Sequence, residues 1–184
     1  MAEVFLGSRT RRPGAWAWQR QVGVILGLCW PLLGQAAAYL FPGNLPSGCS
    51  GSAGSYTCGA VTLAAGDTLS IVVSPTTISF TSLNVGSASI NAAGSASSLT
   101  LNVSGAFQAS AGAVVKANVN AGSVSSTGAV SYGGSLATTT GAVSLGAGTT
   151  VTGALSTTTG AITLLTGTAV SYTTVGSISS GGTV

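Results

Sequence analysis

Apolar and polar residues alternate with a period of two in short segments of the C-terminal half. Val143 and Leu145 flank Ser144, and Ile162 and Leu164 flank Thr163. Such alternation is typical of a strand that buries one face. Glycines separate these segments and predict sharp corners or positive backbone φ angles. They include Gly128, Gly141, Gly146, Gly153, Gly160 and Gly167.

The strand-and-corner pattern repeats along the chain. Residues 136–145 (LATTTGAVSL) recur nineteen positions later as 155–164 (LSTTTGAITL), and the Leu-Asn-Val of residues 83–85 recurs at 101–103 and more loosely at 117–119. A short repeat of this kind predicts one coil of a solenoid per unit. We therefore expect an all-β, single-stranded parallel β-solenoid of right-handed winding, with about seven coils after residue 60.

An antiparallel sandwich is the competing architecture, because it too has short strands punctuated by turns. Its hairpin signatures, Asn-Gly and Asp-Gly, are absent from residues 39–184, and the repeats keep one fixed phase. With 45% apolar residues and a mean hydropathy of +0.58, the chain is also too apolar for a disordered segment, although only 4% of its residues are charged. The solenoid is the favoured prediction.

The N-terminal region has the layout of a secretory signal. Arg9, Arg11, Arg12 and Arg20 precede an apolar stretch over residues 22–33, and the small residues 36–38 supply a cleavage site. We expect residues 1–38 to form a helical signal peptide. A retained membrane anchor is the alternative, but Pro31 and Gly34 interrupt the apolar run.

Removal of this signal changes the charge of the protein. Asp67 and Lys116 are then the only charged side chains, so the basic sequence pI of about 9.0 results from the arginines of the signal. We therefore expect no nucleic-acid partner.

Asp67 follows a glycine, as a turn residue bonding nearby backbone does. With one carboxylate and no histidine, neither an acid–base pair nor a serine triad is available. We predict no enzyme activity, no cofactor and no metal site.

Two cysteines remain after the predicted signal, Cys49 and Cys58. An even pair in an exported chain predicts a disulfide, and the absence of histidine and of a second thiol pair disfavours a metal site. Together with the nearby prolines, this loop predicts an N-terminal cap over residues 39–60. We expect the coils to occupy residues 61–184 and to continue beyond this chain, because no closing segment follows them.

The segments 39–49 (YLFPGNLPSGC) and 54–67 (GSYTCGAVTLAAGD), followed by Gly/Ser/Thr-rich coils, resemble the N-terminal region of bacterial MshQ-type proteins. These are large exported proteins linked to the mannose-sensitive haemagglutinin, a type IV pilus. The resemblance implies a surface or pilus-associated role and pilus or surface components as partners.

Three functions fit these observations. The leading hypothesis is a structural or adhesive module in the bacterial periplasm, at the cell surface or outside the cell. The second is ligand or ice binding by an outward threonine array, for which Thr138, Thr140, Thr157 and Thr159 are the candidates because they recur at equivalent repeat positions. The third is self-association into filaments through open solenoid ends. Membrane contact is expected only through an uncleaved signal.

Overall fold

The computed structural model of the chain describes residues 35–180, so the predicted signal helix lies outside the described residues apart from the last positions of the segment. Within this range the chain is almost entirely β-strand, and its one helix is the short 3-10 helix η1 (Ala96–Ser98). The strands are β1 (Ala38–Phe41), β2 (Cys49–Ser52), β3 (Ser55–Leu63), β4 (Thr68–Ile71), β5 (Thr76–Val85), β6 (Ser89–Ile90), β7 (Leu99–Ser110), β8 (Val114–Val115), β9 (Asn118–Thr127), β10 (Ser131–Tyr132), β11 (Leu136–Thr138), β12 (Val143–Leu145), β13 (Thr150–Leu164) and β14 (Ala169–Ser180). None of the described helical segments has the length and apolar character needed to span a membrane.

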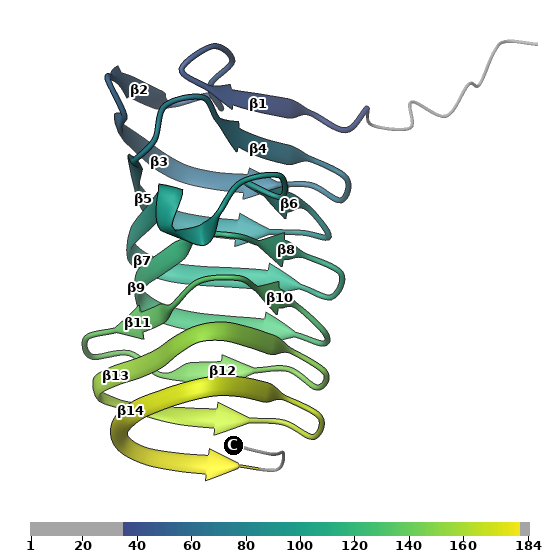
Figure 1. Cartoon of the computed structure of the whole chain (residues 1–184), viewed down its shortest axis with the longest axis vertical. Coiled ribbons are helices and arrows are strands. Elements are labelled where there is room, and N and C mark those ends of the chain that lie inside the picture. Colours follow the sequence, from purple (N-terminus) through teal and green to yellow (C-terminus); the bar gives the residue numbers. More distant parts are fainter. Residues whose placement is uncertain (1–34, 181–184) are drawn as a thin grey trace, which may run out of the picture. The chain divides into compact units, whose positions relative to one another are not determined.

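The strands stack in parallel as a β-solenoid, which confirms the predicted fold class (Figure 1). Each coil has three faces. Face 1 contains β1, β4, β6, β8, β10 and the start of β13. Face 2 contains the first parts of β3, β5, β7 and β9, then β11 and the middle of β13. Face 3 contains the second parts of β3, β5, β7 and β9, then β12 and the end of β13.

The described chain completes about six turns, fewer than the seven expected. The reason is that the early turns are longer than the repeat seen near the C-terminus. On face 3, Leu63 pairs with Val85 and Val85 pairs with Ala109, so each of these early turns is longer than nineteen residues. Near the C-terminus, Leu136 pairs with Leu155 after only nineteen residues. The loop before β5 and the segment with η1 hold the additional residues.

The near-identical segments 136–145 and 155–164 stack in register, as their similarity predicts: Leu136 pairs with Leu155, and Leu145 with Leu164. The Leu-Asn-Val similarity was misleading. Leu83 lies on face 3 beside Phe107, whereas Leu101 lies on face 2 beside Val119. Three-residue matches are too short to fix a register where coil length varies.

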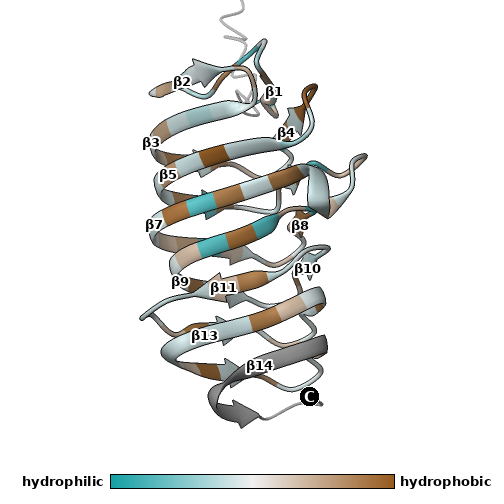
Figure 2. Ribbon diagram, turned by 60° about the vertical axis from the view of Figure 1, so that its left-hand side comes forward, coloured by the Kyte–Doolittle hydropathy of each residue, from teal (hydrophilic) through white to brown (hydrophobic). Residues whose placement is uncertain are grey.

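A narrow apolar core runs through the stack. Apolar residues recur along the strands (Figure 2), and where apolar and polar positions alternate, the apolar side chains point inward and are almost fully buried. Examples at 0% exposure are Leu63, Leu69, Ile78, Leu101, Val119, Leu136 and Leu155. Burying one such side chain stabilises the fold by about 1.5–3 kcal/mol before the cost of conformational entropy.

Burial also raises the pKa of Tyr132, and the neighbouring Ser126 hydroxyl offsets only part of this effect.

One type of corner recurs before the strands of face 1. Its glycine has a positive φ angle, and the next residue is buried and donates its N–H to the carbonyl three residues earlier. The glycines are Gly66, Gly112, Gly148 and Gly167, and the buried residues after them are Asp67, Ala113, Thr149 and Thr168. Of the predicted corner glycines, Gly167 belongs to this class and Gly128 also has a positive φ angle, which favours glycine because it has no Cβ. Gly141, Gly146, Gly153 and Gly160 do not have a positive φ angle.

The N-terminal end of the stack carries the predicted disulfide. Cys49 on β2 and Cys58 on β3 are directly opposed in the only antiparallel strand pair of the described residues, and they form a disulfide bond. Phe41 of β1 packs edge-on against Tyr56 of β3, with ring centroids 4.9 Å apart. Parallel pairing begins with β1, where Ala38 lies opposite Thr68, and on face 2 it begins at Ser55, which lies opposite Thr77.

Candidate functional site

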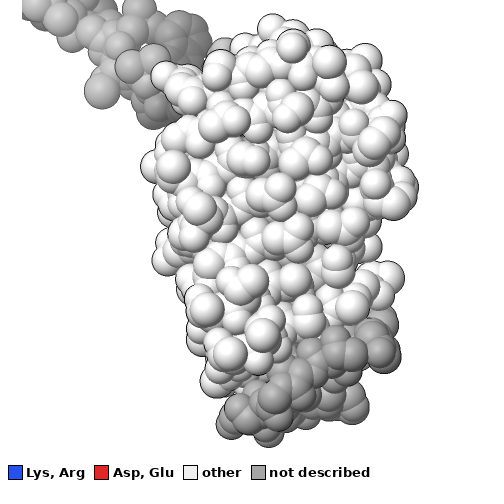
Figure 3. All heavy atoms as spheres, turned by 90° about the vertical axis from the view of Figure 1, so that its left-hand side faces the viewer, with Lys and Arg blue, Asp and Glu red and all other residues white. Residues whose placement is uncertain are grey.

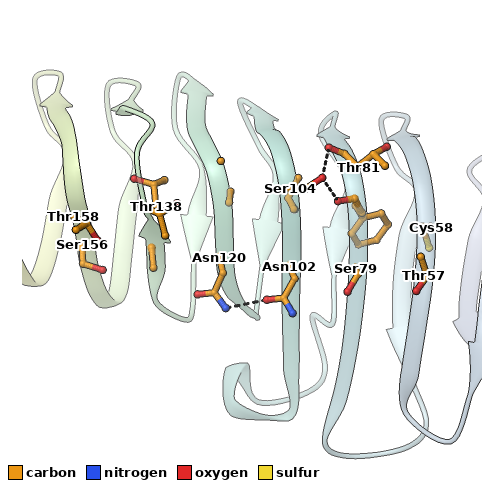
Figure 4. A pocket seen from close by; sticks show the side chains of 16 residues that line it. Thr57, Cys58, Ser79, Thr81, Asn102, Ser104, Asn120, Thr138, Ser156 and Thr158 are labelled. Carbon is orange, nitrogen blue, oxygen red and sulfur yellow. Dashed lines mark hydrogen bonds between the residues drawn. The ribbon is translucent and has the colours of Figure 1, made fainter.

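A groove of about 640 Å³ crosses face 2 from β3 to β13 (Figure 4). It follows the axis of the stack, because equivalent outward residues of successive coils line it. Its first row consists of Thr57, Ser79, Asn102, Asn120, Ala137 and Ser156, each paired in register with the next. Its second row, two positions further along the strands, includes Thr81, Ser104, Gly122, Thr139 and Thr158.

The groove owes its hollow shape to the place where face 2 turns into face 3. Between Phe80 and Leu83, and between Val103 and Ala106, the pairing register shifts and the strands bend. The residues between the two rows, Phe80, Val103 and Ala121, turn their side chains into the core. The outward residues that line the groove are thus mostly polar, and the buried residues between them belong to the apolar core.

Two asparagines occupy adjacent rungs at the centre of the groove. The Asn120 Nδ2 group donates to the Asn102 Oδ1 atom at 3.0 Å, as Figure 4 shows. This bond orients both amides and leaves one donor group, the Asn102 NH2, and one acceptor, the Asn120 Oδ1, outside it. Asn102 is half-buried and Asn120 is exposed. An amide pair of this kind can donate to one ligand group and accept from another.

The Ser104 hydroxyl lies on the second row and points toward the preceding rung. Its Oγ atom is 3.4 Å from the carbonyl oxygens of both Phe80 and Thr81, so these bonds are long and weak. The hydroxyl can therefore exchange these contacts for a ligand at little cost. Gly122, on the next rung, lines the groove without a side chain.

The groove is uncharged. Neither Asp67 nor Lys116, the two charged side chains of residues 35–180, lines it. The face shown in Figure 3 displays no acidic or basic side chain among its described residues. Recognition in this groove must therefore use hydrogen bonds and apolar contact.

The predicted threonine face needs correction. Thr138 and Thr157 do stack in register, but they are only 4% and 6% exposed. Leu136 points inward, and the period-two alternation of a strand turns Thr138 inward as well. The Thr138 hydroxyl donates to the Gly141 carbonyl at 2.7 Å, and the Gly160 N–H donates to the Thr157 hydroxyl at 2.9 Å. These two hydroxyls hold the corner.

Thr140 and Thr159, the other two candidates, are exposed. The Thr159 hydroxyl donates to the Thr139 carbonyl on the preceding rung at 3.2 Å. Neither residue lines the groove, whereas Thr138, Thr139 and Thr158 do. The four predicted threonines therefore do not form one outward array.

Sequence reasoning missed Asn102 and Asn120 as a pair. The Leu-Asn-Val similarity drew attention to asparagines, but it matched Asn102 with Asn84, which lies on face 3 opposite Gln108. The sequence signal that identifies the pair is the spacing of eighteen residues between Asn102 and Asn120. Each asparagine follows a buried residue, Leu101 or Val119, so both asparagines point outward on adjacent rungs.

Asp67 lies away from the groove, at the corner before β4. Its Oδ2 atom accepts the Ala64 N–H and its Oδ1 atom accepts the Ala37 N–H, both at 2.7 Å. The bond to Ala64 confirms the predicted role in a turn. Residues 35–180 contain no group of three or more His, Cys, Asp or Glu side chains that is placed to hold a metal ion.

Comparisons of the chain with protein-family models, with curated proteins and with solved structures found no match.

Proposed function

We propose that this chain is an exported, non-enzymatic surface module that adheres to a neutral polysaccharide held in the groove of face 2. The observation that carries the proposal is the uncharged double row of hydroxyl and amide groups, in register over successive coils. The resemblance to MshQ-type proteins adds an association with a pilus or the cell surface to this proposal.

A polysaccharide suits this groove for three reasons. Each sugar hydroxyl both donates and accepts, which matches the free NH2 of Asn102 and the free Oδ1 of Asn120. A linear chain has a repeating outline, and the groove presents equivalent groups on rungs about 4.8 Å apart. A neutral chain also requires no counter-charge, and the groove has none.

The lack of paired acid and base groups supports binding without hydrolysis. Glycoside hydrolysis ordinarily requires two carboxyl groups that flank the scissile bond. The described residues contain one carboxylate side chain, Asp67, which is buried in a corner and occupied by two backbone N–H groups. We therefore expect the bound polysaccharide to remain intact.

The test is retention of the purified, exported protein on immobilised dextran, β-glucan and galactan, with anionic alginate for comparison. We expect retention on at least one neutral polymer, with the same strength at low and high salt, because no charge contributes. Asn102→Ala and Asn120→Ala together should weaken it about tenfold, since each hydrogen bond contributes about 0.5–1.5 kcal/mol.

Asn84→Ala is the matched control, because Asn84 is an exposed strand asparagine on face 3. It should leave retention unchanged. Absence of retention on every neutral polymer, or equal retention by the groove double variant, would overturn the proposed adhesive role.

A further inference from the structure

Asp67 is unusual among the corner residues of the stack. The equivalent buried positions after the corner glycines hold Ala113, Thr149 and Thr168, which are neutral. Thr168 satisfies its corner by donating its hydroxyl to the Leu165 carbonyl at 2.6 Å. A carboxylate is not needed for the turn, and a buried charge is costly unless it is paired. Asp67 is 5% exposed.

The additional partner of Asp67 is the backbone nitrogen of Ala37, 2.7 Å from Oδ1. Ala37 lies on the rung above the corner, and its carbonyl accepts the Thr68 N–H at 2.9 Å. Ala38 then pairs with Thr68 as the first residue of β1, and its carbonyl accepts the Asn44 side-chain amide at 2.6 Å. Ala37 and Ala38 are thus integral parts of the first rung.

The small-residue rule for signal cleavage permits two sites here. Cleavage after Ala38 has Ala36 and Ala38 at the third and first positions before the cut, and cleavage after Ala36 has Gly34 and Ala36 there. The first site would remove Ala37 and Ala38 with the signal, and with them the Oδ1 partner of Asp67. The second site keeps every one of these bonds.

We propose that signal peptidase cuts between Ala36 and Ala37, and that the new α-ammonium group of Ala37 forms a partly buried ion pair with Asp67. In this hydrolysis, water adds across the Ala36–Ala37 amide bond. Ala36 leaves as the carboxylate end of the signal, and the Ala37 nitrogen takes up a proton to become an ammonium. The hydrogen bond already present between the Ala37 nitrogen and the Asp67 carboxylate then joins two ionised groups, which strengthens it.

The ion pair explains why a carboxylate stands at this corner alone. Export would then complete the N-terminal rung of the solenoid, because the matching cation exists only after the signal has been removed. The inference rests on the proposed export but not on the polysaccharide groove.

The first experiment is intact-mass measurement of the full chain exported from a bacterium with its own signal. We expect a protein that begins at Ala37. Ala38→Leu should be processed at the wild-type site, because residue 38 is not at a position where the peptidase needs a small side chain. Ala36→Leu should block processing, since Ala36 precedes the cut.

A protein beginning at Tyr39, or loss of processing in Ala38→Leu, would overturn the inference while leaving export and the groove intact. An uncleaved chain would overturn both the inference and the proposed export.

The second experiment tests the ion pair through amine reactivity. The processed chain has two amino groups, the α-amino group of Ala37 and the side chain of Lys116. An amine-reactive acetylating reagent near pH 8 should modify the Ala37 amine about tenfold more slowly in the wild type than in Asp67→Asn, because ion pairing keeps the amine protonated and shielded. Lys116 is the internal control and should react equally in both. Equal reactivity of the Ala37 amine in the two proteins would contradict the ion pair, and a merely structural role of Asp67 would not produce the difference.

Discussion

Gly122 tests how tightly the coils approach one another at the bend between faces 2 and 3. A Cβ atom added to Gly122 would lie 2.6 Å from the Ser104 carbonyl oxygen and 2.8 Å from that of Gly105. Real Cβ atoms essentially never approach within 3.0 Å, so one rung must move by at least a few tenths of an ångström against two backbone groups. Overpacking of this kind costs about 1–3 kcal/mol.

Gly59 is the matched control for Gly122. It lies between the face 2 and face 3 parts of β3, and an added Cβ would meet no atom within 4 Å. Alanine reduces the entropy of the unfolded chain at both positions, by about 0.4–1 kcal/mol. The difference between Gly122→Ala and Gly59→Ala therefore isolates the clash.

Urea unfolding followed by circular dichroism measures this difference. We expect Gly122→Ala to lower the free energy of unfolding by about 1–3 kcal/mol relative to Gly59→Ala, with unchanged dependence on urea concentration. If the two variants are equally stable within about 0.5 kcal/mol, the rungs do not approach one another at this bend as closely as the structure shows.

Two further predictions concern buried tyrosines. The Tyr56 hydroxyl is buried with no hydrogen-bond partner among the described residues, so Tyr56→Phe should leave thermal stability unchanged or raise it, whereas Tyr56→Ala should cost about 3–5 kcal/mol; a large loss in Tyr56→Phe would show that the hydroxyl is bonded. Because burial raises the pKa of Tyr132, its contribution to stability is complete below about pH 10 and is lost as the pH rises further, by about 1.4 kcal/mol per pH unit. Alkaline unfolding curves should show this slope in the wild type and a shallower one in Tyr132→Phe, and identical slopes would contradict the assignment.

The solenoid itself was predictable because the sequence repeats where the coils are regular. The pair of segments at 136–145 and 155–164 fixes a register of nineteen residues, and the structure has the same register. The disulfide was also predictable, because the two cysteines that follow the predicted signal have a single intramolecular way to join.

The candidate site was harder to predict, because it depends on coil lengths that vary. The first turns contain the loop before β5 and the segment with η1, which shift the later strands relative to any fixed period. The partnership of Asn102 with Asn120 and the separation of Asn84 onto face 3 follow from that shift. The threonine prediction was wrong at Thr138 and Thr157 for a simpler reason, because the phase of the inward leucine two positions earlier already places each of them inside.

The contact between Ala37 and Asp67 was also beyond the sequence, since thirty residues separate the two. Each residue suggested a local role, one in a cleavage site and the other in a turn. Only the stacking of β1 on β4 brings them together.

Parallel stacking in register underlies both the groove and the Ala37 inference, and one spectroscopic distance tests it most directly. Spin labels on the double cysteine variant Ala137→Cys and Ser156→Cys lie on adjacent rungs of face 2, whose backbones are about 4.8 Å apart. Labels at residues 137 and 144 lie on different faces, although an antiparallel hairpin would place those two positions close together. We expect strong dipolar broadening of the electron paramagnetic resonance spectrum for the 137–156 pair and much weaker broadening for 137–144. Strong broadening for 137–144 alone would contradict the solenoid.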